Sequence, residues 1–173
     1  MLQRITMPAD EHRARAPRTV RVFVLTVSDT RTEATDTSGQ TARELCAAAG
    51  HALVGYRILK DEPAEVRDLV AGLCASGTVD AIIINGGTGL SRRDSTYEAL
   101  TGILQKRLDG FGELFRALSF PEIGPAAMLS RATAGVHQGV VIFATPGSTP
   151  AVKLALERLI LPELGHVVAE ARR

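Results

Sequence analysis

A glycine-rich segment, Gly86-Gly87-Thr88-Gly89, follows a run of apolar residues at 79–84. Glycine adopts positive φ readily and lets ligand atoms approach backbone N–H groups closely, as anion-binding loops require. A helix predicted to begin near Ser95 would direct the positive end of its dipole at the same space. The spacing fits neither the P-loop pattern nor the dinucleotide-binding fingerprint, and a tight turn without a ligand is the alternative. The segment therefore indicates a phosphate-binding loop of another kind.

Two carboxylates stand close to predicted strand ends and could serve such a phosphate site. Asp94 ends the glycine-rich loop, where it could bind Mg²⁺ together with phosphate oxygens or simply cap the next helix. Asp61 follows a predicted strand and precedes Glu62 and Pro63, so capping is the simpler role for it. Parallel strands would nevertheless bring Asp61 to the edge that holds Asp94, where a carboxylate pair could hold a metal or orient an attacking oxygen.

Two further polar turns follow predicted strands. Ser28 and Asp29, with Thr30, could close a turn through their own backbone or bind a heteroaromatic ligand. Pro146, Gly147 and Ser148 precede the last predicted helix, where exposed N–H groups could bind a phosphate or an adenine edge. In the glycine-rich loop, Arg92 and Arg93 could face phosphates or solvent.

Patterns of apolar residues predict the elements that position these turns. A nearly continuous apolar run at 20–27 is typical of a strand buried on both faces, and further strands are predicted at 53–59 and 79–84. Helical spacing predicts helices after a capping box of Thr37 with Gln40, across 66–74, after a second capping box of Ser95 with Glu98, at 111–120, and from 152 to a stop or kink near Pro162. Residues 131–136 and 139–144 could form a hairpin about His137-Gln138.

The order of these elements predicts an α/β fold. We expect a single domain at 19–173 with a doubly wound, mostly parallel sheet, helices on both faces and a small β-hairpin, after a flexible, Arg-rich arm at 1–18. Ligands of such sheets bind beyond the carboxyl ends of the strands. The turns that start at Ser28, Gly86 and Pro146 should therefore converge around one anionic ligand.

Composition excludes several other classes of protein. The chain of 173 residues carries 20 Lys+Arg against 19 Asp+Glu, a balance that argues against a nucleic-acid partner. No apolar run approaches the roughly 20 residues that cross a bilayer, so no membrane partner is expected. The start lacks the apolar region of a secretory signal, and Cys46 and Cys74 lack metal-ligand spacing. A cytoplasmic location is the expectation.

Several segments together resemble one family, the molybdenum cofactor biosynthesis proteins known as MoaB and MogA, whose domain recurs in gephyrin-like proteins. The matching segments lie in the order typical of that family and are VSDTR at 27–31, DTSG at 36–39, GGTGLSRRDST at 86–96, GFGELFRALSFPEIG at 110–124, SRATAGV at 130–136 and PGST at 146–149. Each segment alone is weak evidence, but jointly they cover nearly everything from Val20 onward.

The resemblance implies a protein that binds molybdopterin, a phosphorylated dithiolene pterin, and that assembles as a trimer or a hexamer. In active members a terminal phosphate oxygen of molybdopterin attacks the α-phosphorus of ATP with Mg²⁺, and pyrophosphate leaves. By matched position, Asp61 and Asp94 would be the catalytic carboxylates, with Asp94 on the metal. The cofactor-binding positions carried over are Ser28, Asp29, Gly86, Gly87, Thr88, Gly89, Ser95, Thr96, Pro146, Gly147 and Ser148.

The sequence departs from the family pattern at Tyr97 and Asp109, where many relatives have proline. Some relatives lack one key carboxylate and are doubted as enzymes, but this chain keeps both. The leading hypothesis is a molybdopterin adenylyltransferase. The second is a non-catalytic pterin-binding or scaffold protein that hands the intermediate to a downstream molybdenum-insertion enzyme. The third is a small nucleotide-binding regulator on the same fold.

Overall fold

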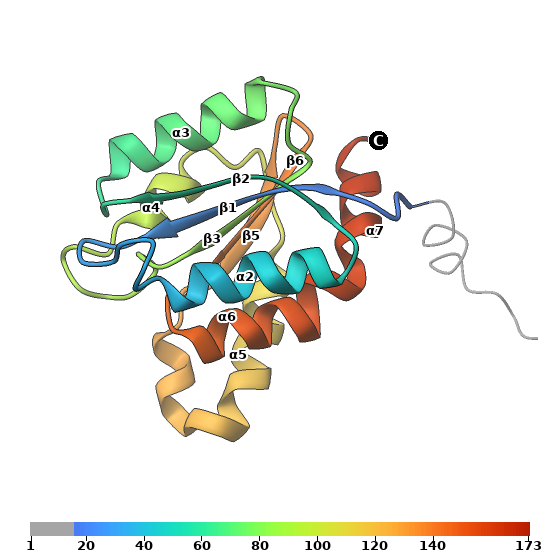
Figure 1. Cartoon of the computed structure of the whole chain (residues 1–173). Helices are drawn as coiled ribbons and strands as arrows, with labels where there is room; N and C mark the ends of the chain where they lie inside the picture. Colours follow the sequence, from blue (N-terminus) through green and yellow to red (C-terminus); the bar gives the residue numbers. More distant parts are fainter. Residues whose placement is uncertain (1–15) are drawn as a thin grey trace, which may run out of the picture.

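A six-stranded sheet with the strand order β2-β1-β3-β6-β5-β4 forms the centre of the computed structural model, which describes residues 16–173 (Figure 1). The strands are β1 (Arg21–Val27), β2 (Ala52–Leu59), β3 (Ala81–Asn85), β4 (Lys106–Arg107), β5 (Thr133–His137) and β6 (Val140–Thr145). The helices are α2 (Thr37–Ala48), α3 (Pro63–Ala75), α4 (Thr96–Thr101), α5 (Asp109–Ile123), η1 (Gly124–Leu129), α6 (Thr149–Ala155), η2 (Leu156–Ile160) and α7 (Leu161–Ala171).

The predicted α/β fold, doubly wound and mostly parallel, is confirmed. Strands β2, β1, β3 and β6 pair in parallel, whereas β5 pairs antiparallel with β6 and with β4. Antiparallel β5 runs opposite to its neighbour, so its first residues lie at the edge where the parallel strands end. This edge therefore collects the ends of β1, β2, β3 and β6 together with the start of β5.

Helices cover both faces of the sheet because successive strand residues point to opposite sides. Ile83 packs into a core beneath α2, α5, α6, η2 and α7, while Ile82 and Ile84 pack into a second core beneath α3 and α4. Figure 1 shows α3 above the sheet and α2 and α6 below it, with α5 and η1 projecting at the bottom. The fully buried β3 explains why its sequence reads as a continuous apolar run.

The predicted hairpin is also present, but its turn is Gln138-Gly139 rather than His137-Gln138. Gln138 and Gly139 both have positive φ, 49° and 76°, which suits the two-residue turn between twisted antiparallel strands. His137 instead belongs to β5, where it pairs with Val140. Glycine at the second turn position decides the placement because it adopts positive φ without strain.

Both predicted capping boxes are wrong, because in each case an aspartate outside the box accepts the hydrogen bond. Helix α2 is capped by Asp36, whose side chain accepts from the Gly39 N–H, and not by Thr37 with Gln40. Ser95 stands at the start of α4, but its hydroxyl donates to Asp61 instead of capping. Capping-box spacing thus located helix starts to within a residue without identifying the bonds made there.

The last helical segment does not stop at Pro162. Leu156–Ile160 form a π-helical turn between α6 and α7, and Pro162 lies in the first turn of α7. Proline lacks an N–H, and the first turn of a helix is where that donor is not needed. At the place where a stop or kink was predicted, the structure has a π-helical turn that ends just before the proline.

No helix within residues 16–173 is long and apolar enough to cross a membrane. Most of the predicted arm, residues 1–15, lies outside the described residues. Its last part packs on the domain, since the Pro17 carbonyl lies 2.3 Å from where a Cβ on Gly165 of α7 would be. The domain boundary at 19 and the cytoplasmic location stay predictions.

Candidate functional site

A cleft of about 530 Å³ lies at the carboxyl edge of the parallel strands. The turns predicted to converge do meet there: Gly86 donates to the Thr145 carbonyl at 3.0 Å, and a Cβ on Gly147 would lie 3.1 Å from the Gly86 Cα. The lining residues are Val27, Ser28, Thr30, Arg31, Gly86, Gly87, Thr88, Gly89, Asp94, Ile123, Ala126, Leu129, Ser130, Pro146 and Gly147. Side chains do not fill the space between the turns.

The glycine-rich loop forms one wall of this cleft in a conformation that other residues adopt only with strain. Gly86 and Gly87 have φ of +99° and +66°, and a Cβ on Gly86 would lie 2.1 Å from the Val27 carbonyl oxygen. Within residues 16–173, no acceptor is recorded for the N–H groups of Gly87, Thr88, Gly89 and Leu90. Successive N–H groups without protein acceptors are the donors from which anion-binding nests are built.

Helix α4 adds less to this site than the sequence predicts. It has only 6 residues, and the N–H groups at its start are used within the protein. Ser95 N–H donates to Asp61 at 3.2 Å and Thr96 N–H donates to the Gly87 carbonyl at 3.0 Å. The loop, rather than the helix dipole, therefore supplies the donors for an anion.

Asp61 supports the loop from behind and does not line the cleft. Its Oδ1 accepts from the Ser95 N–H, from the Ser95 hydroxyl at 2.8 Å and from the Thr96 hydroxyl at 3.5 Å. Burial raises the pKa of the Asp61 carboxyl, the bonds from Ser95 lower it, and the negative charges of Asp94 and Asp29 raise it further. The predicted role of Asp61 as the cap of the following helix is wrong. The N-cap residue of α3 is Glu62, and its side chain makes no capping hydrogen bond.

Asp94 is the acidic residue that lines the cleft. Its Oδ2 accepts from the Ser91 N–H at 3.0 Å, and a Cβ on Gly89 would lie 2.6 Å from the same atom. Within residues 16–173 no group of three or more acidic, His or Cys side chains could hold a metal by itself. One carboxylate beside a phosphate-binding loop still fits Mg²⁺, which takes most other ligands from phosphate and water.

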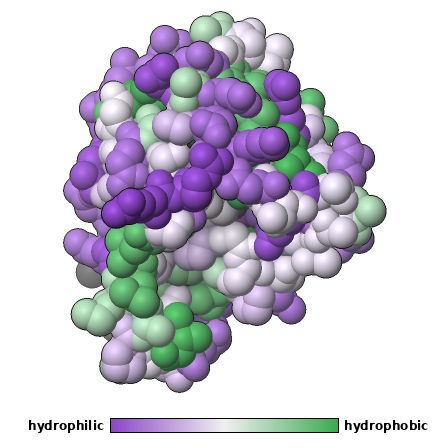
Figure 2. All heavy atoms as spheres, turned by 90° about the vertical axis from the view of Figure 1, so that its left-hand side faces the viewer, coloured by the Kyte–Doolittle hydropathy of each residue, from purple (hydrophilic) through white to green (hydrophobic). Residues whose placement is uncertain are grey.

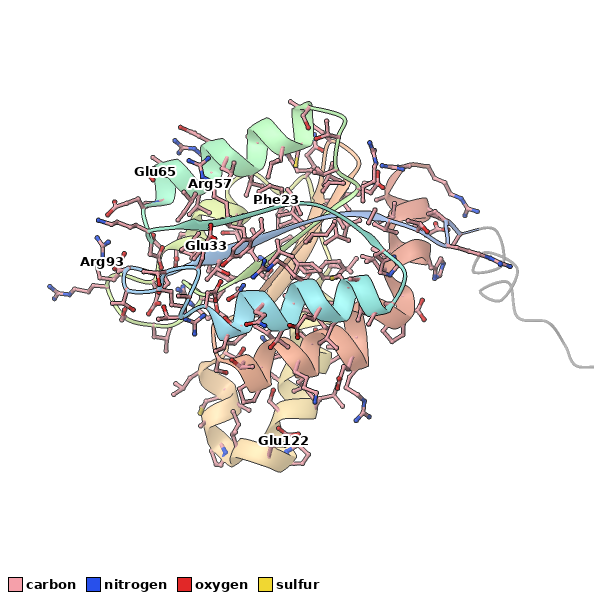
Figure 3. The ribbon with its side chains drawn as sticks, in the orientation of Figure 1. Phe23, Glu33, Arg57, Glu65, Arg93 and Glu122 are labelled. Atoms are coloured by element: carbon pink, nitrogen blue, oxygen red, sulfur yellow. The ribbon has the colours of Figure 1, made fainter. Side chains whose placement is uncertain are left out.

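Asp29 does not line the cleft and instead forms an ion pair with Arg93 of the glycine-rich loop. Arg93 donates to both Asp29 oxygens at 3.1 Å and to Glu62 at 2.9 Å, and the bond from Arg93 holds the pKa of Asp29 below its usual value. Figure 3 shows Arg93 at the same end of the molecule as Glu33 and Glu65, in the region where the loops gather. Arg93 is thus paired with carboxylates instead of facing a ligand, and Arg92 is exposed.

The remaining predicted residues have local roles. The Ser28 hydroxyl accepts from the N–H groups of Thr30 and Arg31 and so closes its own turn, although Ser28 also lines the cleft. Ser95 and Thr96 lie behind the loop with Asp61. Ser148 caps α6 and lines a smaller pocket of about 140 Å³, which shares Ile123, Ser130 and Pro146 with the cleft.

Arg31 lines the cleft and was missed from the sequence. Its Nη2 donates to the Gly147 carbonyl at 2.8 Å, and its Nη1 contacts Asp36, Ser38 and Asn85. These partners belong to a buried polar network that ties β1, β3 and α2 together beneath the turns. The signals for Arg31 in the sequence were its place three residues after Ser28 and its membership of the segment VSDTR, because Asn85 and Gly147 are distant from it along the chain.

The apolar side of the cleft comes from α5 and η1, which were also missed as site elements. Ile123, Ala126 and Leu129 line it, and Ile123 and Leu129 are each 55% exposed. Figure 2 shows this end of the molecule, with hydrophobic residues gathered on its lower, projecting part and hydrophilic residues above. The cleft thus offers polar donors on one side and an apolar surface on the other, as a phosphorylated aromatic ligand would require.

Comparisons with known proteins agree on the family. Residues 23–166 match the protein family described as "Probable molybdopterin binding domain". The chain is 53% identical over 165 residues to molybdenum cofactor biosynthesis protein B of Halalkalibacterium halodurans, covering 95% of this chain and 97% of that one. It is 51% identical over 168 residues to the protein of the same name from Bacillus subtilis, covering 96% and 99%.

Solved structures are similar over the same region. A crystal structure of a molybdenum cofactor biosynthesis protein B has a TM-score of 0.87 at 48% identity and covers 91% of this chain and 99% of that one. The tungsten cofactor synthesizing protein MoaB from Pyrococcus furiosus has a TM-score of 0.81 at 39% identity, with coverage of 91% and 100%. The resemblance read from the motifs is therefore confirmed.

Proposed function

The chain belongs to the molybdopterin-binding family of molybdenum cofactor biosynthesis, and from this we propose that its cleft binds molybdopterin with Mg-ATP and transfers the adenylyl group to the molybdopterin phosphate. In this reaction a phosphate oxygen of molybdopterin attacks the α-phosphorus of ATP. The bond from that phosphorus to the bridging oxygen breaks, and pyrophosphate leaves with the bonding electron pair. Nucleotidyl transfer of this kind needs alignment and charge neutralisation more than covalent help from the protein.

The observation that supports the proposal is the run of N–H groups at 87–89, which lack an acceptor within residues 16–173, with Asp94 on the same cleft. The N–H groups would bind phosphate oxygens, and Arg31 would add a positive charge at the opposite wall. Mg²⁺ held by Asp94 and phosphate oxygens would neutralise negative charge that develops during transfer. Asp61 would keep the loop and the start of α4 in place through Ser95. The apolar surface from α5 and η1 would contact the aromatic part of a ligand.

Pyrophosphate release from protein, molybdopterin and Mg-ATP tests the proposal directly. We expect turnover that falls by about 100-fold or more in Asp94→Asn, because the variant loses the charge that would bind the metal. Asp68→Asn is the matched control, since Asp68 is an exposed carboxylate on α3 away from the cleft. Absence of turnover with fully loaded molybdopterin would remove the enzyme claim.

The alternative, a non-catalytic pterin-binding protein that passes the intermediate to a downstream molybdenum-insertion enzyme, makes different predictions. It predicts micromolar or tighter binding of molybdopterin that does not depend on ATP, with little effect of Asp61→Asn. Calorimetry with molybdopterin and with Mg-ATP, each tested separately, distinguishes the two functions.

We also propose self-association as a trimer or a hexamer. The support is the exposed apolar surface of α5 and η1, where Leu114, Phe120 and Met128 are 56%, 58% and 76% exposed. Exposed apolar surface of this kind marks interaction sites. Phe111 and Phe115 of α5 do not contribute to this surface, because they are buried in the core. Light scattering of the purified protein would measure the oligomer, and a monomer at all concentrations would contradict the proposal.

A further inference from the structure

Arg131 contacts both ends of the glycine-rich loop with one side chain. Its Nε donates to the Thr88 carbonyl at 3.1 Å, and its Nη2 donates to the carbonyl of Asp94 at 3.2 Å and to that of Gly89. Arg131 reaches this edge because it precedes β5, the strand that starts where the parallel strands end. A single guanidinium therefore bonds backbone carbonyls from the glycines of the loop to Asp94, whose side chain lines the cleft.

The guanidinium is itself held in place. Its Nη1 forms an ion pair with Glu98 of α4, and the bond from Arg131 holds the pKa of Glu98 below its usual value. Its Cζ lies 4.8 Å from the centre of the Tyr97 ring, and its side chain is 21% exposed. Arg131 does not line the cleft but borders a neighbouring pocket. Nearly all its donors are engaged by protein acceptors, so its role differs from that of a ligand-binding arginine.

Because the peptide group is planar, a hydrogen bond to a carbonyl also fixes the direction of the N–H in the same peptide. In a trans peptide, the N–H of the next residue points opposite to the carbonyl. The Asp94–Ser95 peptide demonstrates this, because its carbonyl accepts from Arg131 while its N–H donates to Asp61. By the same geometry, bonds from Arg131 to the Thr88 and Gly89 carbonyls direct the N–H groups of Gly89 and Leu90 away from Arg131.

We propose that Arg131 is a positioning residue that fixes the orientation of the loop peptides and the place of Asp94 at the cleft. The expected effect of Arg131 on ligand binding rests on the proposed function, in which the loop binds phosphate oxygens. The geometry demands arginine in particular. Its planar fork presents several N–H groups at once and stacks on an aromatic ring, whereas lysine offers one point charge.

The test compares Arg131→Lys with Arg116→Lys. Arg116 borders the same neighbouring pocket, but among residues 16–173 it donates only to the Ser130 carbonyl, at 3.4 Å, and has no hydrogen bond to the loop. Trypsin provides a readout inside the loop, because Arg92 and Arg93 are exposed cleavage sites between Gly89 and Asp94. Calorimetry with inorganic pyrophosphate and Mg²⁺ provides the readout of anion binding.

Under native conditions we expect Arg131→Lys to speed cleavage after Arg92 and Arg93 by about tenfold and to weaken pyrophosphate binding by about tenfold. Arg116→Lys should change neither. Equal cleavage in wild type and Arg131→Lys, or equal effects of the two variants, would overturn the proposal. If wild type does not bind pyrophosphate, the proposed function is in question, while the cleavage rates still decide the role of Arg131.

A second variant covers the case in which Arg131→Lys does not fold. Glu98→Gln keeps the guanidinium but removes the carboxylate that holds its Nη1. We expect this variant to raise cleavage at Arg92 and Arg93 in the same direction by about threefold, because only one of the anchoring bonds is weakened. Cleavage no faster than in wild type would count against the proposal.

Discussion

Replacing Gly87 by alanine tests how closely the glycine-rich loop packs against its support. Gly87 has φ of +66°, and an added Cβ would lie 2.1 Å from the Thr96 Oγ1 and 2.5 Å from the Asp61 Oδ2. Gly77 offers a matched control, because its φ is +68° and no atom lies within 4 Å of an added Cβ. The two substitutions share the backbone strain and differ in what the new methyl group contacts.

The expected difference follows from these contacts. A left-handed conformation costs a non-glycine residue about 1–2 kcal/mol, offset in part by about 0.4–1 kcal/mol from a less flexible unfolded chain. Both effects apply equally to Gly77→Ala and Gly87→Ala. In Gly87→Ala the Thr96 hydroxyl and the Asp61 carboxylate must also move, and overpacking with a weakened buried hydrogen bond adds roughly 1–3 kcal/mol. Gly87→Ala should therefore be about 2 kcal/mol less stable than Gly77→Ala.

Urea unfolding followed by circular dichroism measures this difference, since the chain has no Trp for fluorescence. All samples should have the same protein concentration, because association would shift the apparent free energy of unfolding. Equal stability of the two variants would refute the reasoning, as it would mean that Gly87 does not approach Asp61 and Thr96 closely.

Two further changes test other parts of the site and the fold. Burial raises the pKa of Asp80, but Arg21 and Arg172 lower it to about 2. Because this folded-state pKa lies below the unfolded value, the carboxylate should add roughly 2 kcal/mol of stability above about pH 4, lost as the pH falls toward 2. Asp80→Asn should flatten the pH dependence of urea unfolding there, and an unchanged slope would contradict this assignment. Arg31→Gln should weaken pyrophosphate binding by about tenfold or more in calorimetry, through loss of a charged donor; unchanged affinity would place the anion elsewhere.

The strands, helices and topology of this protein are easier to predict from the sequence than its polar contacts. Apolar runs such as 79–84 and helical spacing identify strands and helices, because burial on a sheet or beneath a helix imposes a short-range period. The convergence of the turns follows from parallel topology alone. Asp94 and the glycine-rich loop could be chosen as candidates because their chemistry is local, and both line the cleft.

The partners of Asp61, Arg31 and Arg131 could not be read from the sequence. Asp61 bonds Ser95, 34 residues away, and Arg31 bonds Gly147, 116 residues away. No local pattern encodes which of many hydroxyls and carbonyls a side chain will reach. The capping box predicted at Ser95 failed for the same reason, since Ser95 and Glu98 have partners in Asp61 and Arg131 from other elements.

The cleft is assembled from residues that range from Val27 to Gly147. No short fragment of the chain contains all of it, so a ligand that bridges these turns binds only when these distant segments are folded together. Occupancy at about 100 times the dissociation constant then adds roughly 2.7 kcal/mol against unfolding. The supply of ligand would in this way set how long each molecule survives proteases that attack the open chain.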